Sequence, residues 1–223
     1  MKRMTTTVLI LLGVTLFLAV GGCAHSASPA AVGSPGGAAA PPAKESAAAA
    51  EKEPAHTGPV PVLMYHSVGD EKGNDAVISA ARLAEHMAFL HENGYRPVSL
   101  DELAAYLSGS GPLPARPVVL TFDDGYRDTY DTALPILKKY GFRSTMFIPA
   151  GEVGQRLTWD QLREMKAAGM AVESHSLTHR ELAGMTPARQ AEEIARSKDI
   201  LDRNLNQNTR FFCYPNGSYS ADT

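Results

Sequence analysis

The sequence predicts an α/β fold built on a parallel sheet, and three observations support this prediction. From residue 60 onward, short apolar runs alternate with amphipathic stretches of helical period. Glycines at positions 94, 141 and 169 stand where expected helices end and the chain turns toward the next strand. Nearly all candidate reactive side chains directly follow expected strands. Both a barrel and an open doubly wound sheet fit this alternation, and both build their sites at the carboxyl ends of the strands.

Each expected element is marked by its apolar pattern and its boundary residues. Apolar runs predict strands over 60–65, 118–122, 145–149, 170–173 and 210–214. Apolar spacings of three and four predict helices over 80–92, 100–107, 128–140, 159–168 and 187–205. Thr158 and Thr186 are the expected N-caps of the last two helices. Two helical stripes are expected to lie in the core: Leu83, Met87 and Leu90, and then Ile194, Ile200, Leu201 and Leu205.

The first 22 residues are predicted to be an export signal. Two basic residues precede the apolar run Val8–Val20, which is shorter than the ~20 residues that a membrane-spanning helix needs. The stretch Val20–Cys23 resembles the bacterial lipobox, whose cysteine becomes the acylated first residue of the mature protein. We therefore expect an exported lipoprotein anchored to a membrane through Cys23, with an ordinary secreted protein as the alternative. Ala24 carries no acidic retention signal, which favours an outer membrane in a cell that has one.

Residues 23–59 are predicted to be a flexible tether, so that the folded domain spans residues 60–223. Three quarters of residues 24–59 are Ala, Gly, Pro or Ser, and such a segment buries too little apolar surface to offset its ordering entropy. If Cys23 is acylated, Cys213 has no partner for an intramolecular disulfide. The aromatic neighbours of Cys213 predict a small buried side chain rather than a nucleophile.

The charge balance excludes one class of partner. The chain has 21 Lys and Arg residues against 24 Asp and Glu residues, a formal net charge of −3, and no long basic run. Such a chain lacks the positive surface that a nucleic-acid backbone requires. We therefore expect no nucleic-acid partner.

Two carboxylates and two histidines follow the second and fourth expected strands. Asp123 and Asp124 come after the second strand, and His175 and His179 come after the fourth. One carboxylate oxygen and two imidazole nitrogens are a common zinc set that leaves the fourth position for water. Histidines four residues apart share a face if the backbone makes a helical turn. Each pair alone is a weak signal, because Asp-Asp-Gly is also good turn chemistry, but together they indicate a catalytic metal site.

Four motifs resemble the polysaccharide deacetylases, the NodB-homology group also called carbohydrate esterase family 4. They are Thr121–Gly125, His175–His179, Phe211–Gly217 and the opening stretch Pro61–Val68, which resembles the exported poly-N-acetylglucosamine deacetylase branch. The resemblance covers nearly all of residues 60–223. It implies a distorted (β/α) barrel. It also implies metal-dependent hydrolytic removal of acetyl groups from an N-acetylglucosamine-containing polysaccharide of the cell envelope or biofilm.

The resemblance assigns roles by position. It implies three metal ligands: Asp124, His175 and His179. Zn²⁺ is the first choice for such ligands, and Co²⁺, Ni²⁺ or Fe²⁺ would accept them too. Asp123 would be the general base, and the backbone N–H of Asn216 would help hold the oxyanion. His66 follows the first strand, points to the same rim and is a further catalytic candidate.

The sequence departs from the family pattern at three places. Cys213 stands where many members carry an arginine that orients the base, a departure shared with the biofilm branch. Asn216 stands where tyrosine is usual. The later motifs, including a leucine–histidine pair whose histidine acts as general acid, have no counterpart before Thr223, so we expect a barrel that is incomplete at the C-terminus. The alternative functions are a catalytically inactive carbohydrate-binding lipoprotein and a truncated fragment.

Overall fold

The computed structural model of the chain describes residues 55–71 and 73–223. The predicted leader, Cys23 and most of the predicted tether lie outside these residues. Contacts with the folded domain begin at His56, slightly before the predicted boundary at residue 60. The His56 N–H donates to Leu113 O at 3.1 Å, and its ring centroid lies 5.7 Å from that of Tyr106. In the residues described, no helix is long and apolar enough to cross a membrane.

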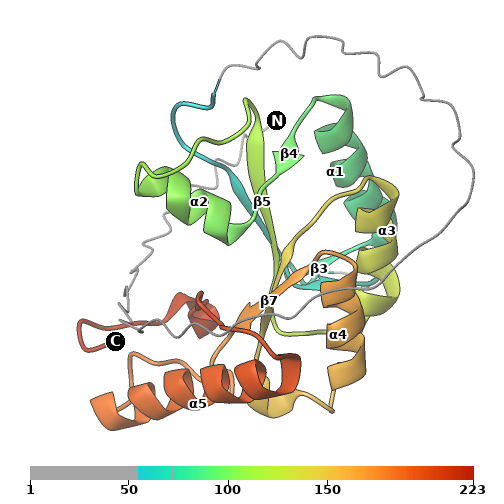
Figure 1. Cartoon of the computed structure of the whole chain (residues 1–223). Helices are drawn as coiled ribbons and strands as arrows, with labels where there is room; N and C mark the ends of the chain where they lie inside the picture. The colour runs from blue at the N-terminus through green and yellow to red at the C-terminus, as the bar shows by residue number, and fades with distance from the viewer. Residues whose placement is uncertain (1–54, 72) are drawn as a thin grey trace, which may run out of the picture. The chain divides into compact units, whose positions relative to one another are not determined.

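A five-stranded sheet forms the centre of the domain (Figure 1), and all its strand pairs are parallel. This arrangement confirms the predicted α/β class. Two further short strands form a separate parallel pair. The main path runs β1 (Val62–Tyr65), β5 (Pro117–Phe122), β6 (Thr145–Ile148), β7 (Ala171–Ser174), with β4 (Arg96–Pro97) also paired to β5; the separate pair is β2 (Ser67–Val68) with β3 (Val77–Ile78).

The helices lie close to their predicted positions. They are α1 (Ala80–Glu92), α2 (Leu100–Leu107), α3 (Leu134–Lys139), α4 (Trp159–Ala167) and α5 (Pro187–Leu205). The helix expected over 128–140 is divided, because a π-helical turn, η1 (Thr129–Ala133), precedes α3. Pro135 explains the division, since it has no N–H to donate to residue 131 and its ring crowds that carbonyl.

Several helices begin or end beside the residues that the sequence predicts as their boundaries. The side chains of Thr158 and Thr186 each accept a hydrogen bond from the backbone N–H three residues later, which confirms both as N-caps. The glycines at the ends of α1, α3 and α4 have positive φ angles of 70°, 64° and 90° at Gly94, Gly141 and Gly169. Residues with a Cβ are strained in this conformation, so glycine suits these turns.

Apolar side chains cover both faces of the sheet. On one face, α1, α3 and α4 pack together with Phe122 and Met146 (Figure 1), and the predicted stripe Leu83, Met87 and Leu90 is buried there. On the other face, α2 packs against the sheet through a second cluster. Its buried members are Val98, Leu100, Leu103, Leu113, Val119 and Phe147.

The predicted apolar stripe of α5 is only half correct. Leu201 and Leu205 are buried, but Ile194 and Ile200 are only half-buried. The first half of the helix buries polar residues instead: Gln190, Glu193 and Ser197.

The strand expected over 210–214 is reduced to one isolated parallel bridge between Ser174 and Phe212. Two neighbours limit its pairing. The carboxylate of Glu173 accepts hydrogen bonds from the Arg210 and Phe211 N–H groups, both at 2.9 Å. Pro215 has no N–H and ends the extended stretch. This segment still continues the sheet beyond β7 and brings residue 213 to the end of that strand.

Candidate metal centre and active site

Four of the predicted site residues, Asp123, Asp124, His175 and His179, lie together at one edge of the sheet. Asp123 and Asp124 directly follow β5, and His175 directly follows β7. Strand β6 lies between these two strands, and all three run parallel. Their carboxyl ends therefore meet at the same edge, where sites of parallel sheets form.

Asp124, His175 and His179 form a compact group of ligand atoms. Asp124 Oδ1 lies 3.3 Å from His175 Nε2 and 2.8 Å from His179 Nε2, and the two imidazole rings are 4.8 Å apart. Asp124 Oδ1 is nevertheless buried and accepts no hydrogen bond within the described part of the chain. Two nitrogens and one carboxylate oxygen that converge without hydrogen bonding fit a divalent metal ion that prefers N and O ligands.

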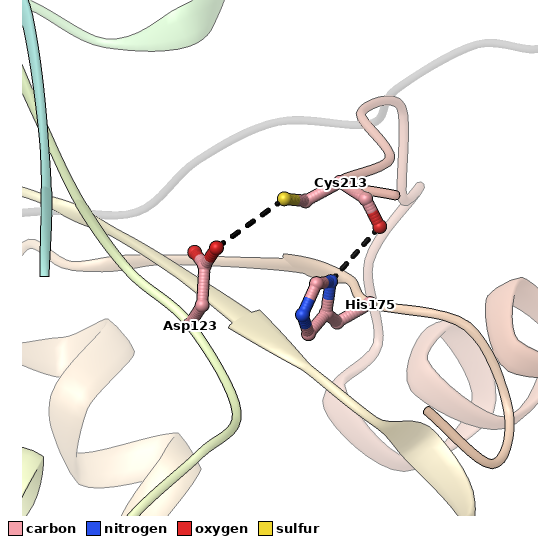
Figure 2. Close-up of side chains that lie close together, drawn as sticks. All are labelled: Asp123, His175 and Cys213. Atoms are coloured by element: carbon pink, nitrogen blue, oxygen red, sulfur yellow. Dashed lines mark hydrogen bonds between the residues drawn. The ribbon is translucent and has the colours of Figure 1, made fainter. Parts of the chain in front are cut away.

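His175 is fixed on both sides by backbone groups. Its N–H donates to Ile148 O at 3.0 Å, and its Nδ1 lies 2.9 Å from Cys213 O (Figure 2). Because a carbonyl oxygen only accepts hydrogen bonds, Nδ1 carries a proton, and Nε2 is the ring nitrogen that faces Asp124. The hydrogen bond to Cys213 O thus orients His175 with Nε2 toward the site.

The residues from His175 to His179 form an irregular loop. The two histidines would share a face of a helix if the backbone made a helical turn, and this condition is not met. Ser176 and His179 have left-handed backbone angles, with φ of 67° and 56°. The His179 N–H donates to Ser176 Oγ at 2.9 Å. A side-chain-stabilised turn, not helical periodicity, brings the two imidazoles together.

The backbone at Asp124 is held in a tight turn. Asp124 and Gly125 both have positive φ, 69° and 61°, as the Asp-Asp-Gly turn chemistry suggests. Arg156 donates from Nη1 to Asp124 O at 3.0 Å and stacks on the Tyr126 ring at 4.4 Å. A Cβ at Gly125 would lie 3.1 Å from Ile148 Cδ1. Glycine therefore allows β6 to pack closely behind the Asp124 carboxylate.

Asp123 is almost completely buried beside this group. Its Oδ2 accepts a hydrogen bond from Cys213 Sγ at 3.4 Å (Figure 2), while Oδ1 has no partner among the described residues. Burial raises the pKa of Asp123, against the opposing effect of His175 and His66. Burial also opposes ionisation of Asp124, but His175 and His179 hold the pKa of Asp124 below its usual range. The pKa values of the two adjacent carboxyl groups are therefore shifted in opposite directions.

Cys213 has a contact that sequence reasoning missed. Burial and the nearby Asp123 carboxylate raise the pKa of the Cys213 thiol, so it stays protonated and acts as a donor. This state agrees with the expectation that Cys213 is not a nucleophile. The strand alternation offered a signal for its direction, because Cys213 lies with Phe211 on the face of the second apolar cluster. The contact with Asp123 itself had no local signal.

A second group, Asp123, His175 and Cys213, also brings ligand atoms within 4.8 Å of one another. Two observations favour the first group for a metal. The Asp123 carboxylate and the Cys213 thiol already hydrogen bond to each other, and burial keeps the thiol proton in place by raising its pKa. Both groups contain His175, so only one of them could use His175 Nε2 to bind a metal ion at a time.

The structure treats His66 and Asn216 differently. His66 follows β1 and lies near enough to both carboxylates for its charge to lower the pKa of Asp123 and of Asp124. Asn216 is exposed in the short turn η3 (Pro215–Gly217), with φ of 53°. Its side-chain nitrogen lies 3.4 Å from Glu181 Oε1.

Comparison with known proteins agrees with this architecture. The polysaccharide deacetylase family matches residues 110–223, just over half of the chain. The chain belongs to the polysaccharide deacetylase family. The Streptococcus pyogenes deacetylase PplD, solved with acetate, superposes with a TM-score of 0.70 and 32% identity over 73% of this chain and 76% of that one. IcaB from Ammonifex degensii superposes with a TM-score of 0.69 and 30% identity over 76% of this chain and 78% of that one. The predicted family and its α/β fold are thus confirmed.

Curated relatives of this chain are longer than the matched region. The Bacillus subtilis protein YxkH, named as a polysaccharide deacetylase, is 39% identical over 166 residues, which is 74% of this chain and 59% of YxkH. The Escherichia coli poly-β-1,6-N-acetyl-D-glucosamine N-deacetylase is 35% identical over 136 residues, 52% of this chain and 20% of that protein. The chain therefore spans less than two thirds of the length of these relatives.

Proposed function

We propose that this deacetylase-family chain hydrolyses N-acetyl groups of a polysaccharide that contains N-acetylglucosamine, in a metal-dependent reaction. The observation that carries the proposal is that His175 Nε2 and His179 Nε2 both lie beside Asp124 Oδ1. This oxygen is buried and has no hydrogen-bond partner among the described residues. Asp123, directly beside this group, supplies a carboxylate whose raised pKa suits a general base. The printed name of the Escherichia coli relative supports poly-β-1,6-N-acetylglucosamine as the first substrate to test.

The three ligand residues would hold one divalent metal ion. Zn²⁺ suits two imidazoles and a carboxylate best, and Co²⁺, Ni²⁺ and Fe²⁺ accept the same ligands. When bound, the ion supplies Lewis-acid polarisation of the acetamide carbonyl. The Nδ1 bond of His175 to Cys213 O leaves Nε2 facing the site, and the lowered pKa of Asp124 favours its carboxylate form.

The remaining residues move protons and stabilise charge. Asp123 accepts a proton from the attacking water at Oδ1, its unpartnered oxygen, while the Cys213 thiol holds Oδ2. His66, near both carboxylates, is the candidate donor of a proton to the leaving amine. The backbone N–H of Asn216 is assigned to the oxyanion of the tetrahedral intermediate.

The N-terminal segment is assigned to export and anchoring. The lipobox-like stretch before Cys23 supports a lipoprotein on the periplasmic or cell-surface side of a membrane, with the domain held out by residues 24–54. Labelling with radioactive palmitate in a bacterial host tests this assignment. The wild-type chain is expected to incorporate label and Cys23→Ala to incorporate none, and equal labelling of both chains would contradict it.

Acetate release tests the proposed activity directly. The purified chain is incubated with soluble poly-β-1,6-N-acetylglucosamine oligomers after chelator treatment, with and without added Zn²⁺. Zinc-dependent release that Asp124→Ala abolishes is expected, with Asp131→Ala as an exposed carboxylate control on η1. Oligomer binding without acetate release, unchanged by Asp124→Ala, would instead identify a carbohydrate-binding protein.

A further inference from the structure

The first half of α5 buries polar side chains where an amphipathic helix normally buries apolar ones. Gln190, Glu193 and Ser197 are at most 2% exposed, and the same stripe continues with Leu201 and Leu205. Glu193 is the most unusual of them, because it is fully buried. A buried carboxylate is costly unless hydrogen-bond donors surround it. The donors that surround Glu193 therefore indicate what the residue does.

All three hydrogen bonds to the Glu193 carboxylate come from the loop that precedes His179. Oε2 accepts from the Leu177 N–H at 3.1 Å and from the Thr178 N–H at 2.8 Å. Oε1 accepts from Thr178 Oγ1 at 2.7 Å. Hydrogen bonds to an ionised carboxylate are stronger than those between neutral groups. Glu193 thus holds two consecutive residues of the loop from inside the protein.

The loop has a backbone that needs such support. Ser176 and His179 both have left-handed φ angles, a conformation that costs residues with a Cβ about 1–2 kcal/mol each. Strained residues persist where their surroundings over-determine them. The loop also accepts two backbone hydrogen bonds: the Ala150 N–H donates to Ser176 O at 3.0 Å, and the Gly151 N–H donates to Leu177 O at 2.8 Å. Hydrogen bonds therefore hold the loop both to α5 and to the turn η2 (Ala150–Glu152).

We propose that Glu193 is a positioning residue for the metal ligand His179. Its carboxylate fixes the backbone of Leu177 and Thr178, and this keeps His179 Nε2 beside Asp124 Oδ1. His175 needs no such support, since its own strand and Cys213 O hold it. The inference rests on the proposed metal site. It adds to that site a residue of α5 that is distant in sequence from the three ligand residues.

The dissociation constant for Zn²⁺, measured by competition with a chromophoric chelator, tests the proposal. Glu193→Ala is expected to bind Zn²⁺ about 10-fold more weakly than the wild type, within the range found for residues that orient metal ligands. Glu193→Gln is expected to lose less, because its amide oxygen still accepts from both backbone N–H groups. Two controls are expected to keep wild-type affinity: Glu192→Ala, at a partly exposed position, and Gln190→Ala, which is buried on the same stripe but bonds Met185 O.

A double-mutant cycle separates positioning from a general structural effect. In a His179→Ala background, Glu193→Ala is expected to cause no further loss of Zn²⁺ affinity, because the ligand it positions is absent. An equal fold-loss in both backgrounds, or an equal loss in Gln190→Ala, would overturn the proposal. Thr178→Val removes one of the three bonds and replaces Glu193→Ala if that variant does not fold; unchanged Zn²⁺ affinity would then count against the proposal.

The same titrations distinguish this proposal from the proposed function. If the wild-type chain binds no Zn²⁺, the metal site itself is wrong. If the wild type binds Zn²⁺ and Glu193→Ala binds it equally well, only the positioning role is wrong.

Discussion

The two histidines of the candidate metal centre are held in different ways. His175 sits at the end of β7, is 2% exposed, and is fixed by backbone groups on two sides. His179 lies in an irregular loop, with 28% of its side chain exposed, and depends on Ser176, Glu193 and η2 for its conformation. A ligand at a strand end inherits its position from the sheet. A ligand on a loop needs dedicated side chains to reach the same point.

Replacing either histidine is expected to have the largest effect, and the two replacements are expected to differ in how much they lower the free energy of unfolding. His175→Ala and His179→Ala are both expected to abolish detectable deacetylation, because each removes a metal ligand. His175→Ala is also expected to lower the free energy of unfolding by about 2 kcal/mol, since it leaves a buried cavity and an unpaired carbonyl at Cys213. His179→Ala is expected to cost less than about 1 kcal/mol. Urea unfolding of the chelator-treated proteins measures both values, and equal losses would contradict the comparison.

A substitution in η2 tests the hydrogen bonds between η2 and the His179 loop. A Cβ at Gly151 would lie 2.6 Å from Leu177 O, so Gly151→Ala is expected to displace the loop. The expected cost is about 1–3 kcal/mol in stability, with Zn²⁺ affinity reduced roughly 10-fold. Gly184→Ala is the matched control, because a Cβ there meets no atom within 4 Å. Wild-type Zn²⁺ affinity in Gly151→Ala would show that the loop does not depend on this contact.

The contact between Cys213 and Asp123 predicts a smaller, purely catalytic effect. Cys213→Ala removes the donor to Asp123 Oδ2 and is expected to lower kcat about 5-fold, the equivalent of ~1 kcal/mol. Zn²⁺ affinity is expected to stay unchanged, because His175 bonds the carbonyl of residue 213 and not its side chain. Cys213→Ser retains a donor and is expected to recover most of the rate. A loss of Zn²⁺ affinity in Cys213→Ala would place the thiol in the metal site instead.

A further effect, confined to stability, concerns the attachment of residues 210 and 211 to β7. Burial raises the pKa of Glu173 to about 6 from its ordinary value of 4.5. The folded protein therefore binds this proton more tightly than the unfolded chain, and stability is lost as the pH rises through about 6. Glu173→Gln is expected to exceed the wild type by about 1–2 kcal/mol at pH 7.5 and to match it at pH 4.5. Urea midpoints at both pH values measure the difference, and a pH-independent difference would refute this explanation.

The sequence predicted the parts of the site that periodic structure positions. The strands before Asp123 and His175, the parallel sheet and the N-caps Thr158 and Thr186 follow from local patterns, and the structure confirms them. The loop that joins His175 to His179 could not be predicted, because Ser176 adopts a left-handed angle that no spacing rule indicates.

The remaining errors have the same origin in long-range contacts. Glu193 carries no local sequence signal for its role, because its partners Leu177 and Thr178 lie 16 and 15 residues away. The shortened strand over 210–214 reflects the Glu173 carboxylate, which takes two of its N–H groups. Contacts between distant side chains and backbone leave no local pattern to read.

X-ray absorption spectroscopy of the zinc-loaded chain tests the central claim most directly, because it reports which atoms surround the metal. Ligation by Asp124, His175 and His179 predicts only nitrogen and oxygen neighbours at about 2.0–2.2 Å, with the multiple-scattering signature of two imidazoles. Cys213→Ala should leave this spectrum unchanged. A sulfur neighbour at about 2.3 Å, lost in Cys213→Ala, would place the metal between Asp123, His175 and Cys213 and contradict the account.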